Sequence, residues 1–427
     1  MRAGGPDDGC TARVLAGTAG GRLGRWLAAG DHLLGGLRAL VGPFPAIVVE
    51  VTGAQDVVAA AGAGLGDGPA SAEAIAVRLR RSGRHITVSP GPVVRRRRDL
   101  AGRCRERGRD AVRVLRADPS LLPELQIGSW WAAGWRARLV RRLALATRLP
   151  TGVLAPPLTA DIAFWSGVRE AATAPEWRRL TASSYVVLCY HRLAGAAVPG
   201  QERMDVDPAA LRRQLTCLRL LGWRALAARE LVRFHRAEGP PLPRRRYVIT
   251  ADDGFADAVT ALSRHASRRP QLFAVTSAVG GRAEWLGDAP LAGWDELGHA
   301  QTVGATVGSH ARRHVRLDRL DRASIATELR GSLDDLRSHL DPPVPVLAYP
   351  HGAHDARVRQ VARDAGYRLA YTTRQGRNGA GTDPWCLRRV EPKIWDSTAS
   401  FAWKVLTGES PPRAWERRLE RRWRRHR

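Results

Sequence analysis

The sequence predicts an α/β protein whose second half is a distorted parallel (β/α) barrel of about seven strands, preceded by a smaller α/β domain of unclear type. Short, wholly apolar runs such as residues 185–190 are typical of strands that are buried on both faces of a parallel sheet. Helical segments separate these runs, as the crossover connections between parallel strands require. A chain of 427 residues is also long enough for two to three domains.

Residues 1–150 form the smaller α/β region, and their sequence does not indicate a role. Strands and helices alternate in it, which favours a parallel sheet here as well. The expected strands are 46–51, 86–88 and 112–115, and the expected helices lie around 71–81 and 94–108.

Residues 129–180 combine tryptophan with arginine, as in Trp130, Trp131 and Arg141. Such a segment can bind nucleic acid through base stacking and phosphate contacts. No known nucleic-acid module accompanies it, so we favour an amphipathic helix that packs its tryptophans against neighbouring structure, with nucleic acid not expected as a partner. Several prolines then indicate a linker at residues 151–184.

Residues 185–395 form the predicted barrel, in which functional side chains are expected just after the carboxyl ends of the strands. The expected strands are 185–190, 247–250, 272–275, 303–307, 344–348 and 369–372. The expected helices are 208–221, 227–237, 256–266, 322–340 (opened by Asp321) and 355–365.

Three loops at expected strand ends carry polar side chains. They contain Asp252-Asp253, His310 with His314, and the sequence YPHG at residues 349–352. Each pattern alone is weak, because paired aspartates often cap helices and two histidines four residues apart are often structural. Their common position at one edge of the sheet predicts a single shared site.

These residues resemble the motifs of the polysaccharide deacetylase family, also called the NodB-homology or carbohydrate esterase family 4 domain. TADDG at 250–254 is similar to the family's first motif, Thr-Phe-Asp-Asp-Gly, and HARRH at 310–314 to its second, His-Ser/Thr-x-x-His. YPHG at 349–352 resembles the third motif of the subgroup that acts on poly-N-acetylglucosamine. The strand that ends before His191 and the segment 387–390 resemble that subgroup's first and last strands.

The resemblance implies a metal-dependent hydrolase that removes N-acetyl groups from an acetylated carbohydrate, either a glycan or a glycan precursor. Asp253, His310 and His314 supply one carboxylate and two imidazoles to a divalent ion, leaving positions for water and substrate. Zinc is the usual metal, and the ligand set also suits cobalt, nickel or manganese. Asp252 acts as general base for attack by the metal-bound water.

Further roles in the site are assigned to the YPHG loop and to one tryptophan. The backbone N–H of His351 is expected to stabilise the oxyanion. The side chain of His351 or of His354, or the metal-bound water, is a candidate proton donor, since the segment 387–392 lacks the late histidine of many family members. We expect Tyr349, Pro350 and Trp294 to contact substrate.

Three alanines depart from the family's motifs. Ala251 replaces phenylalanine, with a local effect on packing. Ala311 stands where serine or threonine usually holds the second histidine, and Ala348 where many members have an arginine that contacts the catalytic aspartate. Because Ala311 has no hydroxyl, we expect His314 to be less firmly oriented.

The formal net charge of +27 comes almost entirely from arginine. It indicates either a field that attracts anionic partners or a compositional drift. The predicted tail, residues 396–427, includes a basic amphipathic helix at 413–427 with Trp415, Leu419 and Trp423 on one stripe. This pattern suits peripheral contact with an anionic membrane surface. Together with the absent late histidine, it motivates the alternative function, a catalytically impaired carbohydrate-binding or scaffold protein associated with such a surface.

The expected location is cytoplasmic, with a possible site at the inner membrane surface. The five cysteines are odd in number and form no CxxC pair, which is typical of a reducing compartment. The first residues lack the apolar core of a signal peptide, and no run reaches the ~18 apolar residues of a spanning helix.

Overall fold

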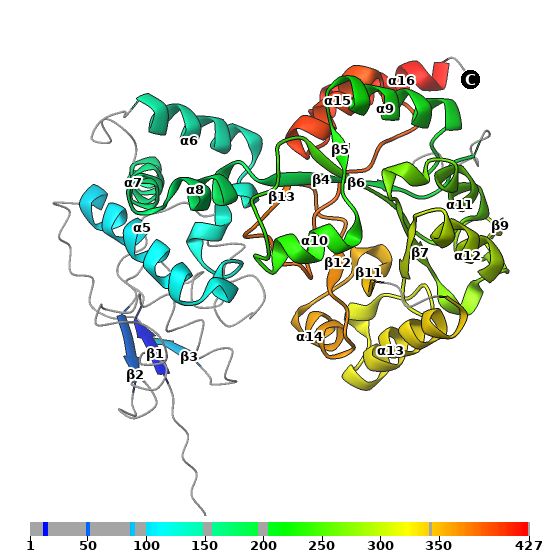
Figure 1. Cartoon of the computed structure of the whole chain (residues 1–427), viewed down its shortest axis with the longest axis horizontal. Coiled ribbons are helices and arrows are strands. Elements are labelled where there is room, and N and C mark those ends of the chain that lie inside the picture. Colours follow the sequence, from blue (N-terminus) through cyan, green and yellow to red (C-terminus); the bar gives the residue numbers. More distant parts are fainter. Residues whose placement is uncertain are drawn as a thin grey trace, which may run out of the picture. The chain divides into compact units, whose positions relative to one another are not determined.

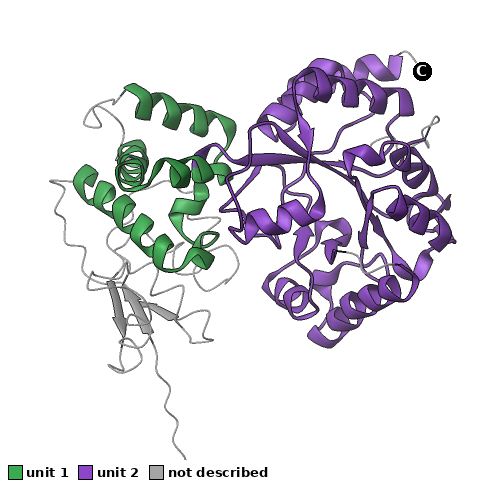
Figure 2. Ribbon diagram, in the orientation of Figure 1, with its two compact units in different colours: residues 1–180 green, residues 181–427 purple. Residues whose placement is uncertain are grey.

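The computed structural model describes residues 100–147, 156–194, 204–340 and 344–425, together with the backbone of three short strands near the amino terminus. The chain divides into two compact units, residues 1–180 and 181–427 (Figure 2). Among the described helices, none combines the length and the apolar character that a membrane span requires.

The second unit is built on a curled parallel sheet with the strand order β12-β11-β10-β7-β6-β4. These strands are β4 (Ser184–Tyr190), β6 (Arg246–Ala251), β7 (Gln271–Ala274), β10 (Thr306–Ser309), β11 (Val346–Ala348) and β12 (Leu369–Tyr371). The two-residue strand β5 (Arg224–Ala225) also pairs with β6, and β13 (Asn378–Gly379) pairs antiparallel with β4.

Residues 387–390, which we call the closing segment, complete the ring between the two outer strands. The amide of Leu387 donates to the carbonyl of Ala370 in β12 (2.9 Å), and the amide of Val390 donates to the carbonyl of Val187 in β4 (2.9 Å). Both bridges are parallel. Six strands and the closing segment therefore make a seven-stranded parallel barrel, which confirms the predicted fold class.

Helices surround this sheet (Figure 1). They are α9 (Pro208–Leu220), α10 (Ala228–His235), α11 (Ala256–Ser263), α12 (Trp294–Thr302), α13 (Arg322–His339) and α14 (Ala356–Asp364). Helix α13 begins after Asp321 as predicted, because this carboxylate accepts a hydrogen bond from the amide of Ser324 (2.8 Å). The prediction missed α12 and began strand β10 three residues too early, since Val303 caps the end of α12.

Two helices follow the closing segment, α15 (Thr398–Thr407) and α16 (Arg413–Arg425). The apolar stripe of α16 packs against its own domain. The ring centre of Trp415 lies 6.0 Å from that of Trp403, and the ring centre of Trp423 lies 6.1 Å from that of Trp395. The arginine-rich face of α16 is the face left to contact an anionic surface. Contact between α16 and a membrane therefore stays a prediction, in a form that does not insert Trp415 and Trp423 into the membrane.

The first unit contains α5 (Leu100–Ala117), α6 (Trp135–Thr147), α7 (Pro156–Ala171) and α8 (Ala174–Thr181). Its strands are β1 (Ala12–Leu15), β2 (Val48–Val51) and β3 (Ile86–Ser89). Strands β2 and β3 lie where we expected them. The sheet is mixed rather than parallel, because β1 pairs antiparallel with β2 and parallel with β3. The expected helix at 71–81 lies outside the described residues.

Two expectations for this part of the chain differ from the structure. The expected strand at 112–115 is the end of α5, because its apolar residues continue the helical stripe of buried Cys104, Gly108 and Ala111. Helices α7 and α8 fill most of the range 151–184, in place of a linker. The prolines at the start of α7 occupy the first helical turn, where proline is compatible with a helix.

Helices α5 and α7 approach each other closely at two glycines. A Cβ atom on Gly108 would lie 2.1 Å from the carbonyl oxygen of Phe164, and one on Gly167 would lie 1.8 Å from that of Arg105. Trp130 lies in this core with 1% of its surface exposed, in edge-to-face contact with Trp165. The tryptophans therefore pack inside the unit, as favoured above.

Candidate metal centre

The candidate site lies at the carboxyl ends of β6, β10 and β11. These strands are parallel and adjoin one another through β7 and β10, so the loops that follow them open onto the same rim. The loop after β6 contributes Asp252 and Asp253, and the loop after β10 contributes His310 and His314. One ligand atom from each of Asp253, His310 and His314 lies within 4.8 Å of the other two.

The spacing of these atoms suits a metal ion. The Nε2 atoms of His310 and His314 lie 3.2 Å and 3.4 Å from Oδ1 of Asp253. Ligand bonds of about 2.1 Å at tetrahedral angles place neighbouring ligand atoms roughly 3.4 Å apart. The two separations from Asp253 therefore match those of ligands on one ion, and the two imidazole nitrogens lie within 4.8 Å of each other.

The hydrogen bonds around His310 orient it for this role. Its Nδ1 lies 2.8 Å from the carbonyl oxygen of Ala348, so Nδ1 carries the proton and donates it. In the neutral ring, which is the form that binds a metal, the lone pair is then on Nε2, which lies 3.2 Å from Oδ1 of Asp253. Asp253 itself adopts a left-handed backbone (φ 71°), and Gly254 follows with φ 82°. This tight turn re-aims the carboxylate at the end of its strand, at a cost in backbone strain.

Helix α13 fixes the histidine loop from behind. The buried carboxylate of Glu328 accepts hydrogen bonds from the backbone N–H of Arg313 (2.8 Å) and from its guanidinium (2.6 Å). The hydroxyls of Ser309 and Ser332 also lie 2.7 Å apart. The loop is therefore preorganised by α13, the helix expected at 322–340, although the sequence analysis gave Glu328 and Ser332 no role.

His314 is held differently from His310. Its Nδ1 is buried and has no hydrogen-bond partner in the described structure, as expected where Ala311 supplies no hydroxyl. The indole of Trp285 stacks on the imidazole instead, with ring centres 4.8 Å apart and planes at 26°. Burial, followed by the charge of His310, lowers the pKa of His314 to about 4. His314 is therefore neutral near pH 7, which is the form that binds a metal.

Arg389 of the closing segment clamps Asp252. Two guanidinium nitrogens donate to the two carboxylate oxygens, each at 2.6 Å, and a third donates to the carbonyl of Thr372 (2.9 Å). Burial alone would raise the pKa of Asp252, but Arg389 outweighs it and holds that pKa well below its usual range. Arg389 thus makes the contact that Ala348 cannot make.

His191 follows β4 and lies at the same rim. One of its ring nitrogens lies within 4.8 Å of a carboxylate oxygen of Asp252 and of the Cys189 sulfur. This second group is poorly suited to a metal, because Arg389 already occupies Asp252 and burial raises the pKa of the Cys189 thiol well above its usual value. His191 is instead an imidazole beside the carboxylate, and the sequence analysis gave it no role.

The two histidines of the YPHG region differ in availability. His351 has a left-handed backbone (φ 57°), and its exposed ring lies 4.4 Å from that of His314. In this turn the amides of the next two residues donate to the carbonyls of Tyr349 and Pro350. His354 contacts the carbonyl of Gly352 through Nδ1 (2.8 Å) and the sulfur of Cys386 through Nε2 (3.6 Å). His354 is therefore a poor candidate for the proton donor.

The three residues assigned to substrate contact have packing partners within the chain. Tyr349 is fully buried, and its hydroxyl donates to the carbonyl of Trp385 (3.2 Å). Pro350 is buried as well. Trp294 begins α12 and stacks on His339, with ring centres 4.1 Å apart and planes at 6°. Tyr349 and Pro350 belong to the core around the site, so we no longer assign them to substrate, whereas Trp294 is partly exposed and its contact with substrate stays a prediction.

Comparison with known proteins gives one family. Residues 239–370 match the family model "Polysaccharide deacetylase". The matched range includes Asp252, Asp253, His310, His314 and the YPHG loop. No curated protein matches the chain.

Several solved structures are similar to this chain. Streptococcus pyogenes deacetylase PplD in complex with acetate is 21% identical, with 52% of this chain and 98% of that chain covered and a TM-score of 0.46. IcaB from Ammonifex degensii is 22% identical, with 53% and 98% covered and a TM-score of 0.45. The BpsB deacetylase domain from Bordetella bronchiseptica is 20% identical, with 49% and 95% covered and a TM-score of 0.41.

Proposed function

We propose that this protein uses a divalent metal ion to remove N-acetyl groups from a glycan or glycan precursor. The proposal starts from its polysaccharide deacetylase domain at residues 239–370, which makes it a hydrolase of carbon–nitrogen bonds in carbohydrates. The observation that carries the proposal is the convergence of Asp253, His310 and His314 on one point, with the lone pair of His310 turned toward it. Zinc suits this ligand set best, and cobalt, nickel or manganese would also bind.

The ion, when bound, supplies a lowered water pKa and a positive charge that polarises the acetamide carbonyl. Asp252 is the general base and accepts the proton of the attacking water. Arg389 keeps this carboxylate ionised and fixes its orientation through two hydrogen bonds. A carboxylate with a lowered pKa releases a proton readily, so Asp252 passes it on within the site.

We assign the proton donor for the leaving amine to His191. Its ring nitrogen lies within 4.8 Å of an Asp252 carboxylate oxygen, a separation that one water molecule can bridge for proton transfer. For His351 we propose only the backbone role, in which its N–H stabilises the oxyanion. The left-handed backbone at His351 supports this, because such strain is found where an amide has to be aimed.

The function is tested by acetate release from N-acetylglucosamine oligomers, using protein stripped of metal and then loaded with zinc or cobalt. We expect turnover that depends on the metal and falls about 10²–10⁴-fold in Asp252→Asn, which keeps the shape of the side chain. If the loaded wild type releases no acetate from oligomers or lipid-linked precursors, while Asp253→Ala still loses a bound ion, the protein is a binding or scaffold protein.

The proton donor is tested with two kinds of substrate. An acetamide needs a proton on its leaving amine, whereas 4-nitrophenyl acetate releases a stable phenolate without one. We expect His191→Gln to slow acetamide hydrolysis about 10²–10⁴-fold and to leave ester hydrolysis nearly unchanged. If His351→Gln has this selective effect and His191→Gln does not, the assignment is wrong.

A further inference from the structure

Helix α6 of the first unit buries arginines and exposes apolar side chains. A helix at the surface of a globular domain usually does the reverse, with its apolar stripe on the core and its charges in solvent. In α6, Arg138 and Arg141 are each only 6% exposed. The exposed residues include Leu139 (48%), Val140 (41%) and Leu143 (57%). The outer side of α6 is therefore apolar to an unusual degree.

The buried arginines fix the rotation of α6 about its axis. Two nitrogens of the Arg141 guanidinium donate to the two carboxylate oxygens of Asp161 in α7, at 2.6 Å and 2.7 Å. The guanidinium carbon of Arg141 lies 5.5 Å from the ring centre of Trp165. That of Arg138 lies 5.3 Å from the ring centre of Trp131. Turning the leucines inward would leave the carboxylate of Asp161 without its counter-charge, which is costly for a buried group.

The three exposed residues form one surface, which we call the α6 patch: Leu139, Val140 and Leu143. Residues three and four positions apart are neighbours on a helix, so Leu143 lies beside both of the others. Single exposed apolar residues are common, whereas a contiguous apolar patch with a polar rim marks a site of interaction. Figure 1 shows α6 along an edge of the first unit, where a partner can reach it.

The charged residues of α6 are all basic. The helix contains four arginines and no acidic residue. Two of the arginines, Arg136 and Arg142, are exposed. They lie three residues before and after Leu139, at the margins of the α6 patch. An apolar face with basic margins is typical of a helix that lies in the plane of an anionic lipid surface.

A protein partner suits the α6 patch less well than a lipid surface. A stable protein interface takes about 20–30 residues from each side, whereas this patch has three residues on a convex helix. A helix at a lipid surface needs only to place its apolar side chains about 5–10 Å deep, between the headgroups and the acyl chains.

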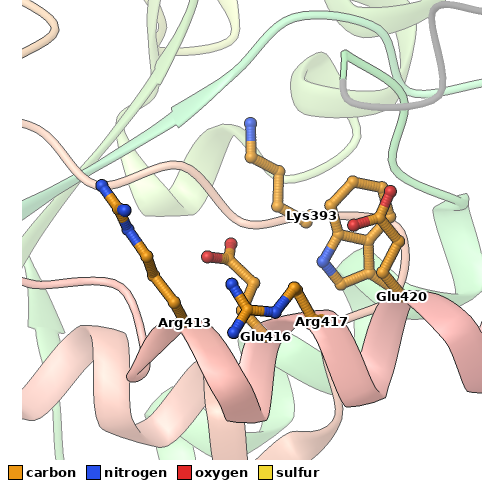
Figure 3. A pocket seen from close by; sticks show the side chains of 6 residues that line it. Lys393, Arg413, Glu416, Arg417 and Glu420 are labelled. Carbon is orange, nitrogen blue, oxygen red and sulfur yellow. The ribbon is translucent and has the colours of Figure 1, made fainter.

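The other basic helix, α16, is less suited to this role than α6. Its tryptophans already pack against the second unit. Figure 3 shows the side chains of Glu416 and Glu420 on α16 beside Arg417, where they line a pocket of about 230 Å³. Carboxylates therefore accompany the arginines of α16, and they would weaken its attraction to anionic lipid.

We propose that α6 docks this protein on an anionic phospholipid surface. The α6 patch enters the boundary between headgroups and acyl chains, and Arg136 and Arg142 contact the lipid phosphates. This contact lies outside the metal centre and goes beyond the proposed function. Because vesicle binding requires no turnover, it stands or fails independently of that function.

Vesicle binding tests the proposal. The full chain is sedimented with vesicles of phosphatidylcholine alone, or of equal parts phosphatidylcholine and phosphatidylglycerol, and its partition coefficient is measured. We expect roughly 25-fold or more tighter binding to the anionic vesicles, since each of the two exposed arginines contributes about fivefold. The double variant Leu139→Gln with Leu143→Gln should bind these vesicles about tenfold more weakly than the wild type, because two half-exposed leucines no longer enter the lipid.

Two further variants make the outcome specific. Leu220→Gln is the matched control, because Leu220 is 76% exposed but lies at the end of α9 in the second unit, so its binding should equal that of the wild type. The double variant Arg421→Gln with Arg422→Gln removes two exposed charges of α16. A loss of binding in this α16 variant, together with wild-type binding in the double leucine variant, would overturn the proposal. An equal loss in Leu220→Gln would overturn it as well.

Folding and oligomeric state are measured on the same proteins. The urea midpoint of the double leucine variant should equal that of the wild type, because both leucines are about half exposed. If it is lower, Leu143→Ala replaces that variant, since alanine keeps the helix, and should weaken binding about threefold. A wild-type dimer that the leucine substitutions convert to monomers would assign the α6 patch to a second copy of the chain and refute lipid docking. A wild type that sediments with neither kind of vesicle would also refute it.

Discussion

The ion pair between Arg389 and Asp252 makes a strong prediction about stability. Both side chains are almost fully buried, with 2% and 4% exposed, and two hydrogen bonds of 2.6 Å join them. Removing one partner of such a pair leaves an uncompensated buried charge and costs about 3–5 kcal/mol. We therefore expect Arg389→Met to lower the free energy of unfolding by about that amount, and Asp252→Asn to lower it by about 2–4 kcal/mol because Asn can still accept one hydrogen bond.

The double variant Arg389→Met with Asp252→Asn separates the interaction energy of the ion pair from the cost of burying either charge alone. With both charges gone, no unpaired charge stays buried, so the combined loss should be smaller than the sum of the single losses by about 3 kcal/mol. The measurement is urea unfolding of the full chain at pH 7, followed by circular dichroism. Arg312→Met is the control, because its ion pair with Asp335 is partly exposed and should contribute less than about 1 kcal/mol. Additive losses, or single losses near that of the control, would refute this account of the pair.

Three further predictions concern the metal and the packing. Trp285→Ala should weaken zinc affinity about tenfold by releasing His314, whereas Trp285→Phe should stay close to wild type in a chelator competition. His310→Ala should abolish stoichiometric metal in elemental analysis, whereas substitution of the exposed His299 should not; metal retained in His310→Ala would exclude the site. Gly108→Ala should destabilise the protein by about 2 kcal/mol or more in the same urea assay, because α7 blocks its Cβ, and a neutral effect would contradict the close helix packing.

The position of the site in the fold was predictable from the sequence, because its signals are local. Each strand is a short apolar run, and the polar residues that follow it mark the same rim of a parallel barrel. This reasoning brought Asp253, His310 and His314 together, although they come from two loops. It required only the direction of the strands, not the packing of individual side chains.

The residues that tune the site were not predictable in this way. Arg389 and Asp252 are 137 residues apart, and nothing in the sequence near either residue indicates the other. Trp285 stacks on His314 from a short hairpin that has no helical or strand period. A weak signal for Arg389 was present, since an arginine between Leu387 and Val390 places a charge inside a segment that has to be buried.

The wrong assignments also have physical causes. Tyr349 was assigned to substrate because it lies in the same motif as His351, but its side chain is buried in the core, where its hydroxyl donates to the carbonyl of Trp385. The apolar end of α5 was read as a strand, because four residues are too few to distinguish the two periods. In both cases a local pattern was compatible with two structures, and burial decided between them.

The closing segment has a consequence for how the protein is made. Ribosomes release a chain from its amino terminus, so β4 emerges about 200 residues before the residues that pair with its far edge. Until Val390 docks, the barrel stays open, the edge of β4 is exposed and Asp252 has no counter-charge. The site around Asp252 is therefore incomplete until residues 387–390 have been made. A chain cut short before residue 387 would carry every motif of the metal centre and still lack a finished enzyme.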